Sequence, residues 1–124
     1  MQYSLMLHSA EATDVDIAPE VMEQFQAAFD AYAKELDAAG LLVSADILQP
    51  VAMTTTLTNH DGELLVQDGP FADTKEKLNG TFVVEVPGLD EAIALAAQCP
   101  GAQYGTMEIR PSAIVFRDGS WTQP

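Results

Sequence analysis

Residues 68–76 read Asp68-Gly69-Pro70-Phe71-Ala72-Asp73-Thr74-Lys75-Glu76 and decide where the middle of the chain turns. Gly69 tolerates a positive φ, and Pro70 fixes its own φ near about −65°. A residue before proline is also pushed away from the helical region, so the pair predicts a turn rather than a helix. We expect Phe71 to fill the core and anchor this loop, and the polar residues 73–76 to begin a short helical turn.

The periodicity of apolar residues on either side of this loop predicts strands and helices in a regular order. Alternation with a period of two indicates strands, and apolar spacings of three and four indicate helices. Asp61-Gly62 is a strong hairpin signal. Before the loop we predict strands at 3–8, 41–48, 54–58 and 63–67 and a helix at 19–39; after it, strands at 81–86 and 105–110, a helix at 89–98 and a tail at 112–124.

This order is β-α-β, a hairpin, then β-α-β, and it predicts an α+β fold of the ferredoxin-like class with an antiparallel sheet. We expect one domain over residues 1–124, with residues 112–124 as a C-terminal tail. Two helices cover only one face of such a sheet. The strand at 81–86 is nevertheless apolar on both faces, except for Glu85. The second face therefore needs a cover, and a second copy of the sheet predicts a homodimer.

Two groups of motifs resemble the signature of the YCII-related family, whose DGPF subgroup takes its name from the run that begins at Asp68. The resemblance extends from about residue 3 to residue 111. It implies a dimeric α+β barrel in which Gly69, Pro70 and Phe71 form the structural motif. It implies a fold more firmly than an activity, because most members have none assigned. The matching residues are Asp68-Gly69-Pro70-Phe71, Thr74-Lys75-Glu76, Gly80-Thr81-Phe82, Leu89-Asp90-Glu91-Ala92, Cys99-Pro100, Tyr104-Gly105-Thr106 and Glu108-Ile109-Arg110-Pro111.

Charge and composition exclude several classes of function. The 124 residues include 19 acidic and 5 basic side chains, a net charge of −14. Such a surface repels phosphate backbones and anionic membranes, so we expect no nucleic-acid partner and no membrane partner. A single cysteine forms no disulfide within the chain and suits the cytoplasm. No metal-ligand spacing and no phosphate-binding glycine motif occurs, so we expect neither a metal nor a cofactor.

Strand alternation places a set of polar residues on one face of the predicted sheet. If the odd-numbered residues of the first strand face the helices, then His8, Glu85, Glu108 and Arg110 face the opposite way, toward the dimer cleft. One interpretation is a polar cleft with a His or carboxylate as general base and Arg110 as a clamp for an anion. The other is a cross-strand Glu–Arg pair and a histidine at a strand end, both purely structural. A register slip of one residue would exchange the set.

Asp68 also has two interpretations. As a turn residue it accepts N–H bonds from its own loop. As a functional residue it is a carboxylate of the cleft, paired with His8 or His60, and some YCII-like proteins resemble enzymes with such a pair. His60 lies in the hairpin turn, so His8 is the better placed partner. Relatives of the DGPF type do not dependably carry a histidine there, and we favour the turn role.

The remaining candidates are Lys75, Tyr104 and Cys99. Lys75 is either a ligand-binding cation or one half of an exposed ion pair with a neighbouring carboxylate. Tyr104 either offers its hydroxyl to the cleft or packs in the core. Cys99 is expected to be a small buried residue, since no basic neighbour in the sequence activates it.

Two functions of different class follow from these candidates and the resemblance. The first is a dimeric module that binds a small organic ligand or a protein, with a link to sigma factors that the resemblance implies. The second is a small cofactor-independent enzyme, resembling lyases or dehydrochlorinases, that acts on a small organic acid or a phenol. A pocket in which His8, Asp68, Glu108 and Arg110 converge would favour the enzyme, and a closed apolar interface would favour the module.

Overall fold

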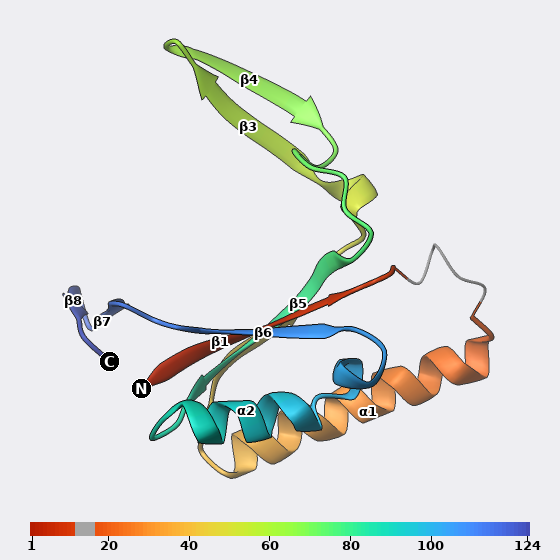
Figure 1. The fold of residues 1–124 in the computed structure, drawn as a ribbon, viewed down its shortest axis with the longest axis vertical. Helices are drawn as coiled ribbons and strands as arrows, with labels where there is room; N and C mark the ends of the chain where they lie inside the picture. The colour runs from red at the N-terminus through yellow and green to blue at the C-terminus, as the bar shows by residue number, and fades with distance from the viewer. Residues whose placement is uncertain (12–16) are drawn as a thin grey trace.

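The computed structural model describes residues 1–11 and 17–124 and has a four-stranded antiparallel sheet at its centre (Figure 1). The strands are β1 (Gln2–Ser9), β2 (Leu42–Ile47), β5 (Lys77–Glu85) and β6 (Thr106–Pro111), in the order β2-β5-β1-β6. β1 lies between β5 and β6 and is antiparallel to both. The ferredoxin-like α+β prediction is confirmed, including the central place of the first strand.

Two helices cover one face of this sheet: α1 (Pro19–Ala38) and α2 (Leu89–Gln98). Pro19 begins α1, where its missing N–H is not needed. Gly40 ends the helix region with a φ of +73°. Two acidic residues lie in the first turn of α2, and a short 3-10 helix, η3 (Pro100–Gln103), follows it. Both helices lie where the periodicity predicts them.

The core lies between the helices and the inward side chains of the sheet. Every second residue of β1 and β5 is buried, as expected for strands with one face on the core. Phe82 packs edge-on to Tyr32, with ring centroids 5.1 Å apart. The Tyr32 hydroxyl donates a hydrogen bond to the Leu95 carbonyl at 2.8 Å, so the one polar atom of this aromatic cluster is satisfied. The buried cluster comprises Tyr3, Leu5, Tyr32, Leu36, Phe82, Val84, Val86, Ala92, Ala96 and Cys99.

A β-hairpin stands apart from this body. After a 3-10 turn, η2 (Val51–Met53), the strands β3 (Thr55–His60) and β4 (Glu63–Asp68) pair with each other in a separate sheet and make few contacts with other elements. We call β3, β4 and their turn the arm. Asp61 and Gly62 both have positive φ, 51° and 84°, which is the geometry of a type I′ turn and confirms the hairpin signal. In Figure 1 the helices lie below the central sheet and the arm rises above it.

The tail forms a second small hairpin of β7 (Val115–Arg117) and β8 (Ser120–Thr122). Asp118 and Gly119 make its turn, and Phe116 packs edge-on to Trp121 with ring centroids 5.3 Å apart. Trp121 lies at the surface. β7 pairs with β8 in a sheet of their own, so the tail does not extend a strand of the central sheet.

Of three expectations for the loop at residues 68–76, one is confirmed and two are wrong. Gly69 has a φ of +96°, which confirms the turn. The helical turn at 73–76 is wrong, because this segment only bends before β5, which begins at Lys77 and pairs with the end of β1. Phe71 does not fill the core: 90% of it is exposed. The loop lies at the base of the arm, where no helix or sheet face among residues 1–11 and 17–124 covers the ring.

Candidate functional site

The candidate site lies on the face of the central sheet that carries no helix. His8 comes from β1, and Glu108 and Arg110 come from the neighbouring β6. The His8 Nε2 atom lies 2.6 Å from the Glu108 Oε1 atom, and the Arg110 Nη2 atom lies 3.8 Å from the other Glu108 oxygen. Alternation therefore places these three side chains correctly. We call them the open-face cluster.

The His8 imidazole is close to the Glu108 carboxylate without being well aligned to it. The Nε2 atom is itself buried, yet no described residue gives it a partner with hydrogen-bond geometry. The His8 side chain as a whole is 25% exposed, and that of Arg110 is 73% exposed. The cluster thus presents one constrained imidazole and one guanidinium that is open to a ligand.

Two further polar residues, Asp46 of β2 and Thr81 of β5, extend this face. The Thr81 hydroxyl donates a hydrogen bond to the Asp46 carboxylate at 2.8 Å. The strand register puts Asp46, Thr81, Met6 and Glu108 in one row across the sheet. Alternation of β5 already places Thr81 on this face. Alternation alone does not predict that Asp46 lies on this face, because β2 has a register shift between Leu42 and Ser44. No sequence signal marks that shift.

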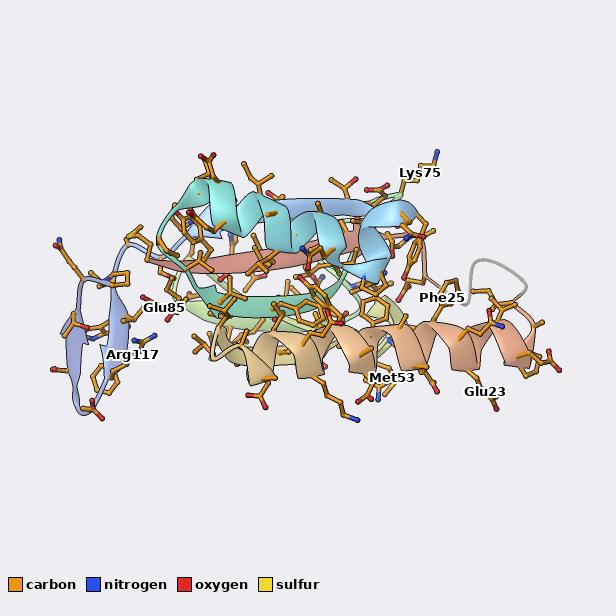
Figure 2. The ribbon with its side chains drawn as sticks, turned by 90° about the horizontal axis from the view of Figure 1, so that it is seen from below. Glu23, Phe25, Met53, Lys75, Glu85 and Arg117 are labelled. Carbon is orange, nitrogen blue, oxygen red and sulfur yellow. The ribbon has the colours of Figure 1, made fainter. Side chains whose placement is uncertain are left out.

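Glu85 shares the face but lies at the other end of the sheet from His8. Its Oε1 atom is 3.1 Å from the N-terminal ammonium group, and its Oε2 atom is 3.8 Å from Arg117. Figure 2 shows Glu85 and Arg117 together beside the C-terminal hairpin. Gln2 of β1 pairs with Glu85, whereas His8 is six residues further along the same strand, about 20 Å at the rise of a β-strand. Glu85 therefore belongs to a terminal ion-pair group and not to the open-face cluster.

Asp68 is not brought to the cluster within one chain. It ends β4 and pairs with Thr55, so it belongs to the arm. The loop around it is held by backbone and hydroxyl bonds: the Gly69 N–H donates to the Thr54 carbonyl, and the Thr56 hydroxyl donates to the Gly69 carbonyl, both at 2.7 Å. Among the described residues, the Asp68 carboxylate has no hydrogen bond or ion pair. Both interpretations of Asp68 stay open.

Lys75 and Tyr104 also lie away from the cluster. Lys75 is exposed at the edge of the molecule in Figure 2, and no described carboxylate lies in ion-pair range of it. Tyr104 packs its ring against Phe25 of α1, with centroids 5.5 Å apart. It therefore lies on the helix side of the sheet. Partial burial, and then the charge of nearby Cys99, raise the pKa of the Tyr104 hydroxyl, so this group stays protonated at neutral pH.

The loop at 68–76 lines a separate hollow at the base of the arm, with a volume of about 690 Å³. Its walls come from η2, from Pro70 and Asp73 of the loop, and from Glu11 and Lys77. Glu11 is buried, and its carboxylate accepts a hydrogen bond from the Val51 N–H at 2.8 Å. This contact fixes the start of the arm to the end of β1. The sequence analysis did not single out Glu11, because a lone glutamate in an acidic stretch carries no signal of burial.

The cluster combines an imidazole, one carboxylate and one guanidinium, and a second carboxylate, that of Asp46, lies on the same face. The hollow at the base of the arm is not centred on the cluster, and neither is a smaller one of about 240 Å³ between α1 and β2. Residues 1–11 and 17–124 contain no group of three or more metal-ligating side chains. None of the helices in the described part of the chain is long and apolar enough to cross a membrane. An imidazole beside a carboxylate can transfer a proton, and a guanidinium can bind an anion.

Comparison with known proteins agrees with the fold and adds a family. The model of the YCII-related domain matches residues 1–113. The chain is also 32% identical, over 116 residues, to an uncharacterized protein of Rhizobium meliloti (strain 1021). That alignment covers 92% of this chain and 94% of the relative. The match to the family model ends just before the small C-terminal hairpin.

Proposed function

The chain belongs to the YCII-related family, and on that premise we propose that it is a homodimeric protein that binds a small organic acid at the open-face cluster. One observation carries this proposal. The buried Nε2 atom of His8 lies 2.6 Å from Glu108 without an aligned hydrogen bond, on a face that no helix covers. Buried polar atoms in folded proteins almost always have aligned partners, so an imidazole held beside one carboxylate without an aligned bond is suited to contact a ligand on this face.

The proposal includes a second copy of the chain because the open face carries apolar as well as polar side chains. Met6 and Val83 lie on it and are already partly shielded by their neighbours. A sheet of this kind is stable with one wet face only when that face is polar. Packing two such faces together would bury Met6 and Val83 and turn the flat cluster into a cleft.

Charge favours an acid as the ligand. Arg110 is one of only 5 cations in the chain and is the most open member of the cluster. Its nearest carboxylate is 3.8 Å away, which is a weak ion pair and leaves the guanidinium able to hold a carboxylate by two hydrogen bonds. His8 would then face the rest of the ligand as a donor or acceptor.

An enzyme is the second candidate, and the His8–Glu108 contact favours it. A histidine oriented by a carboxylate is a common general base. A lyase or dehydrochlorinase-like reaction on a small acid or phenol needs proton removal and no cofactor, which these residues can supply.

A regulatory role beside a sigma factor is the form of the binding proposal that the family resemblance implies. The net charge of −14 would suit a basic protein surface. The buried Cys99 thiol suits a reducing compartment, and we place the protein in the cytoplasm.

A thermal-shift screen of small carboxylic acids and phenols tests the binding proposal, because a ligand that binds only the folded state raises its melting temperature. Arg110→Gln should abolish the shift that the best acid produces. Lys34→Gln removes one positive charge from α1, on the opposite side of the sheet, and should leave the shift intact. Equal loss in both variants would show that net charge, and not the cluster, is responsible. Conversion of the bound compound, lost in His8→Gln, would favour the enzyme.

A further inference from the structure

We propose that the arm grips the second copy: one face of the β3–β4 hairpin packs on the partner in the homodimer. This rests on the proposed homodimer and adds the element that holds it together. The arm is the least supported part of the described chain. An isolated two-stranded hairpin is marginally stable in water, and β3 and β4 pack on each other alone. An arm that is nevertheless regular in structure needs a surface to lie on.

The two faces of the arm differ sharply. The register pairs Leu57 with Val66 and Asn59 with Leu64, so Leu57, Leu64 and Val66 share one face, with the Thr55–Asp68 pair at its base. All three are more than half exposed: Leu64 is 68% and Val66 is 63% exposed. The opposite face carries Leu65 among polar residues: Thr56, Thr58, His60, Glu63 and Gln67. We call the side with Leu57, Leu64 and Val66 the apolar face of the arm.

Charge identifies the occupant as a second copy. The chain has 19 acidic residues, yet residues 47–59 contain no ionisable side chain, and neither do residues 64–67. A surface for a basic partner would keep its acidic residues. A surface for another copy of a chain with net charge −14 must avoid them, because like charges face each other across such an interface. The charged residues of the arm lie at its ends, Asp61 and Glu63 at the turn and Asp68 at the base. The uncharged middle of the arm, between these ends, meets the second requirement.

The direction and length of the arm fit the same occupant. The arm rises on the side of the sheet opposite the helices, where the open-face cluster lies (Figure 1). Six-residue strands reach about 20 Å, whereas two sheets packed face to face lie about 10 Å apart. A second sheet on the open face would therefore sit within reach of the arm, and the arm would extend along its side. Phe71, at the base of the arm and 90% exposed, would be covered in the same step.

Sedimentation equilibrium of three variants tests the arm. Val66→Lys and Leu64→Lys place a charge on the apolar face, and Leu65→Lys places the same charge on the opposite face of the same strand. We expect the first two to weaken the dimer at least about tenfold, because an unpaired charge is costly in an apolar interface. The control should stay within about twofold of the wild type, since its face remains in water. Circular dichroism of each monomer checks that the central sheet and helices are intact.

A second measurement keeps the inference testable if a lysine unfolds the arm. Amide hydrogen exchange of the unaltered protein should be slow in β3 and β4 at high concentration and should quicken in these strands on dilution into monomer. A monomeric wild type at every concentration would refute the homodimer itself. A wild-type dimer that Val66→Lys and Leu65→Lys weaken equally, or not at all, would refute the arm and leave the homodimer standing.

Discussion

The central sheet and the arm are built from the same kinds of residues and have opposite environments. Leu5 and Val84 lie at the centre of the sheet and are fully buried. Leu57 and Val66 lie at the centre of the arm and are more than half exposed. In both places apolar side chains lie opposite each other across paired antiparallel strands: Leu5 opposite Phe82 in the sheet, and Leu57 opposite Val66 in the arm. The difference is what covers the strands: two helices of the same chain cover the sheet, whereas no described element of the chain covers the arm.

This contrast shows that an apolar strand face specifies burial and leaves open which molecule supplies the cover. The helices cover the inner face because α1 follows β1 and α2 follows β5 within one chain. The arm is inserted between β2 and β5 with no helix of its own. We therefore expect substitutions in the sheet to act on the folding of one chain, and substitutions in the arm to act on assembly.

Two phenylalanines give the largest expected difference between these regions. Phe82 is 2% exposed and packs against Phe29 and Tyr32, whereas Phe71 is 90% exposed. Phe82→Ala should lower the free energy of unfolding by about 3–5 kcal/mol. Phe71→Ala, measured at a concentration where the protein is monomeric, should change it by less than about 0.5 kcal/mol. Denaturant unfolding of both variants measures this, and a large cost for Phe71 in the monomer would contradict the exposed position of the ring.

The Phe71 result marks the limit of what sequence predicts here. Alternation in β1, β5 and β6 correctly predicts which side chains face the helices, because one buried face imposes a period of two. The turn at Gly69 is likewise local and is predicted correctly. Where Phe71 points depends on whether another surface is near, and local sequence does not encode that. The same holds for Asp46, whose place depends on a register shift in β2.

Substitutions at two glycines compare the stability cost of a close contact with the cost of a strained backbone conformation. A Cβ atom on Gly105 would lie 2.4 Å from the His8 carbonyl oxygen and 2.9 Å from the Ser9 Cβ atom. Gly105→Ala must therefore push β1 away and should cost about 1–3 kcal/mol. Gly62 in the arm has open space around it, so Gly62→Ala meets only the strain of its φ of +84°, about 1 kcal/mol. Thermal melts compare the two, and an equal or larger cost at Gly62 would contradict the close packing at Gly105.

Alkaline pH should weaken the core and leave the arm unaffected. Burial raises the pKa of the Cys99 thiol above its ordinary value of 9.0, although the backbone N–H groups of Gly101 and Ala102 partly offset this. The thiol is then protonated longer in the folded state than in the unfolded state. Its contribution to stability is complete below the unfolded pKa and is lost as pH rises through the folded pKa.

Cys99→Ala provides the measurement for this pH effect. We expect the melting temperature of the wild type to fall between pH 8 and pH 10 by more than that of the variant. Burial raises the pKa of the Tyr32 hydroxyl in both proteins, and the charge of Cys99 raises it further in the wild type alone, so Tyr32 adds to the expected difference in the same direction. Parallel curves for the two proteins would show that the thiol is not responsible.

The candidate site divides between the two regions in the same way as the fold. His8, Glu108 and Arg110 were placed together from strand alternation, because all three lie on neighbouring strands of the central sheet. Asp68 was proposed as a partner of His8 from family resemblance, and in one chain it ends the arm instead. No pattern within a sequence states how an inserted hairpin is oriented against the sheet that carries it.

Substitution of Asp68 therefore tests the difference between the central sheet and the arm with the smallest expected effect on folding. It is exposed, and its carboxylate has no partner among the described residues, so Asp68→Asn should change the free energy of unfolding by less than about 0.5 kcal/mol. Asp68→Ala tests whether the carboxylate has a role in the turn. A carboxylate that caps loop N–H groups would make the alanine variant worse by about 1–3 kcal/mol, with the asparagine variant near the wild type.

Ligand binding by the same two variants decides whether the arm takes part in the site. If the arm only holds the partner, both should show the full thermal shift with the acid that Arg110 binds, and both should remain dimeric by sedimentation. If Asp68→Asn remains dimeric and folded but loses that shift, an ionised carboxylate at the base of the arm must reach the ligand. Within one chain Asp68 and the open-face cluster belong to different sheets, so this loss would mean that the arm of one copy completes the site of the other.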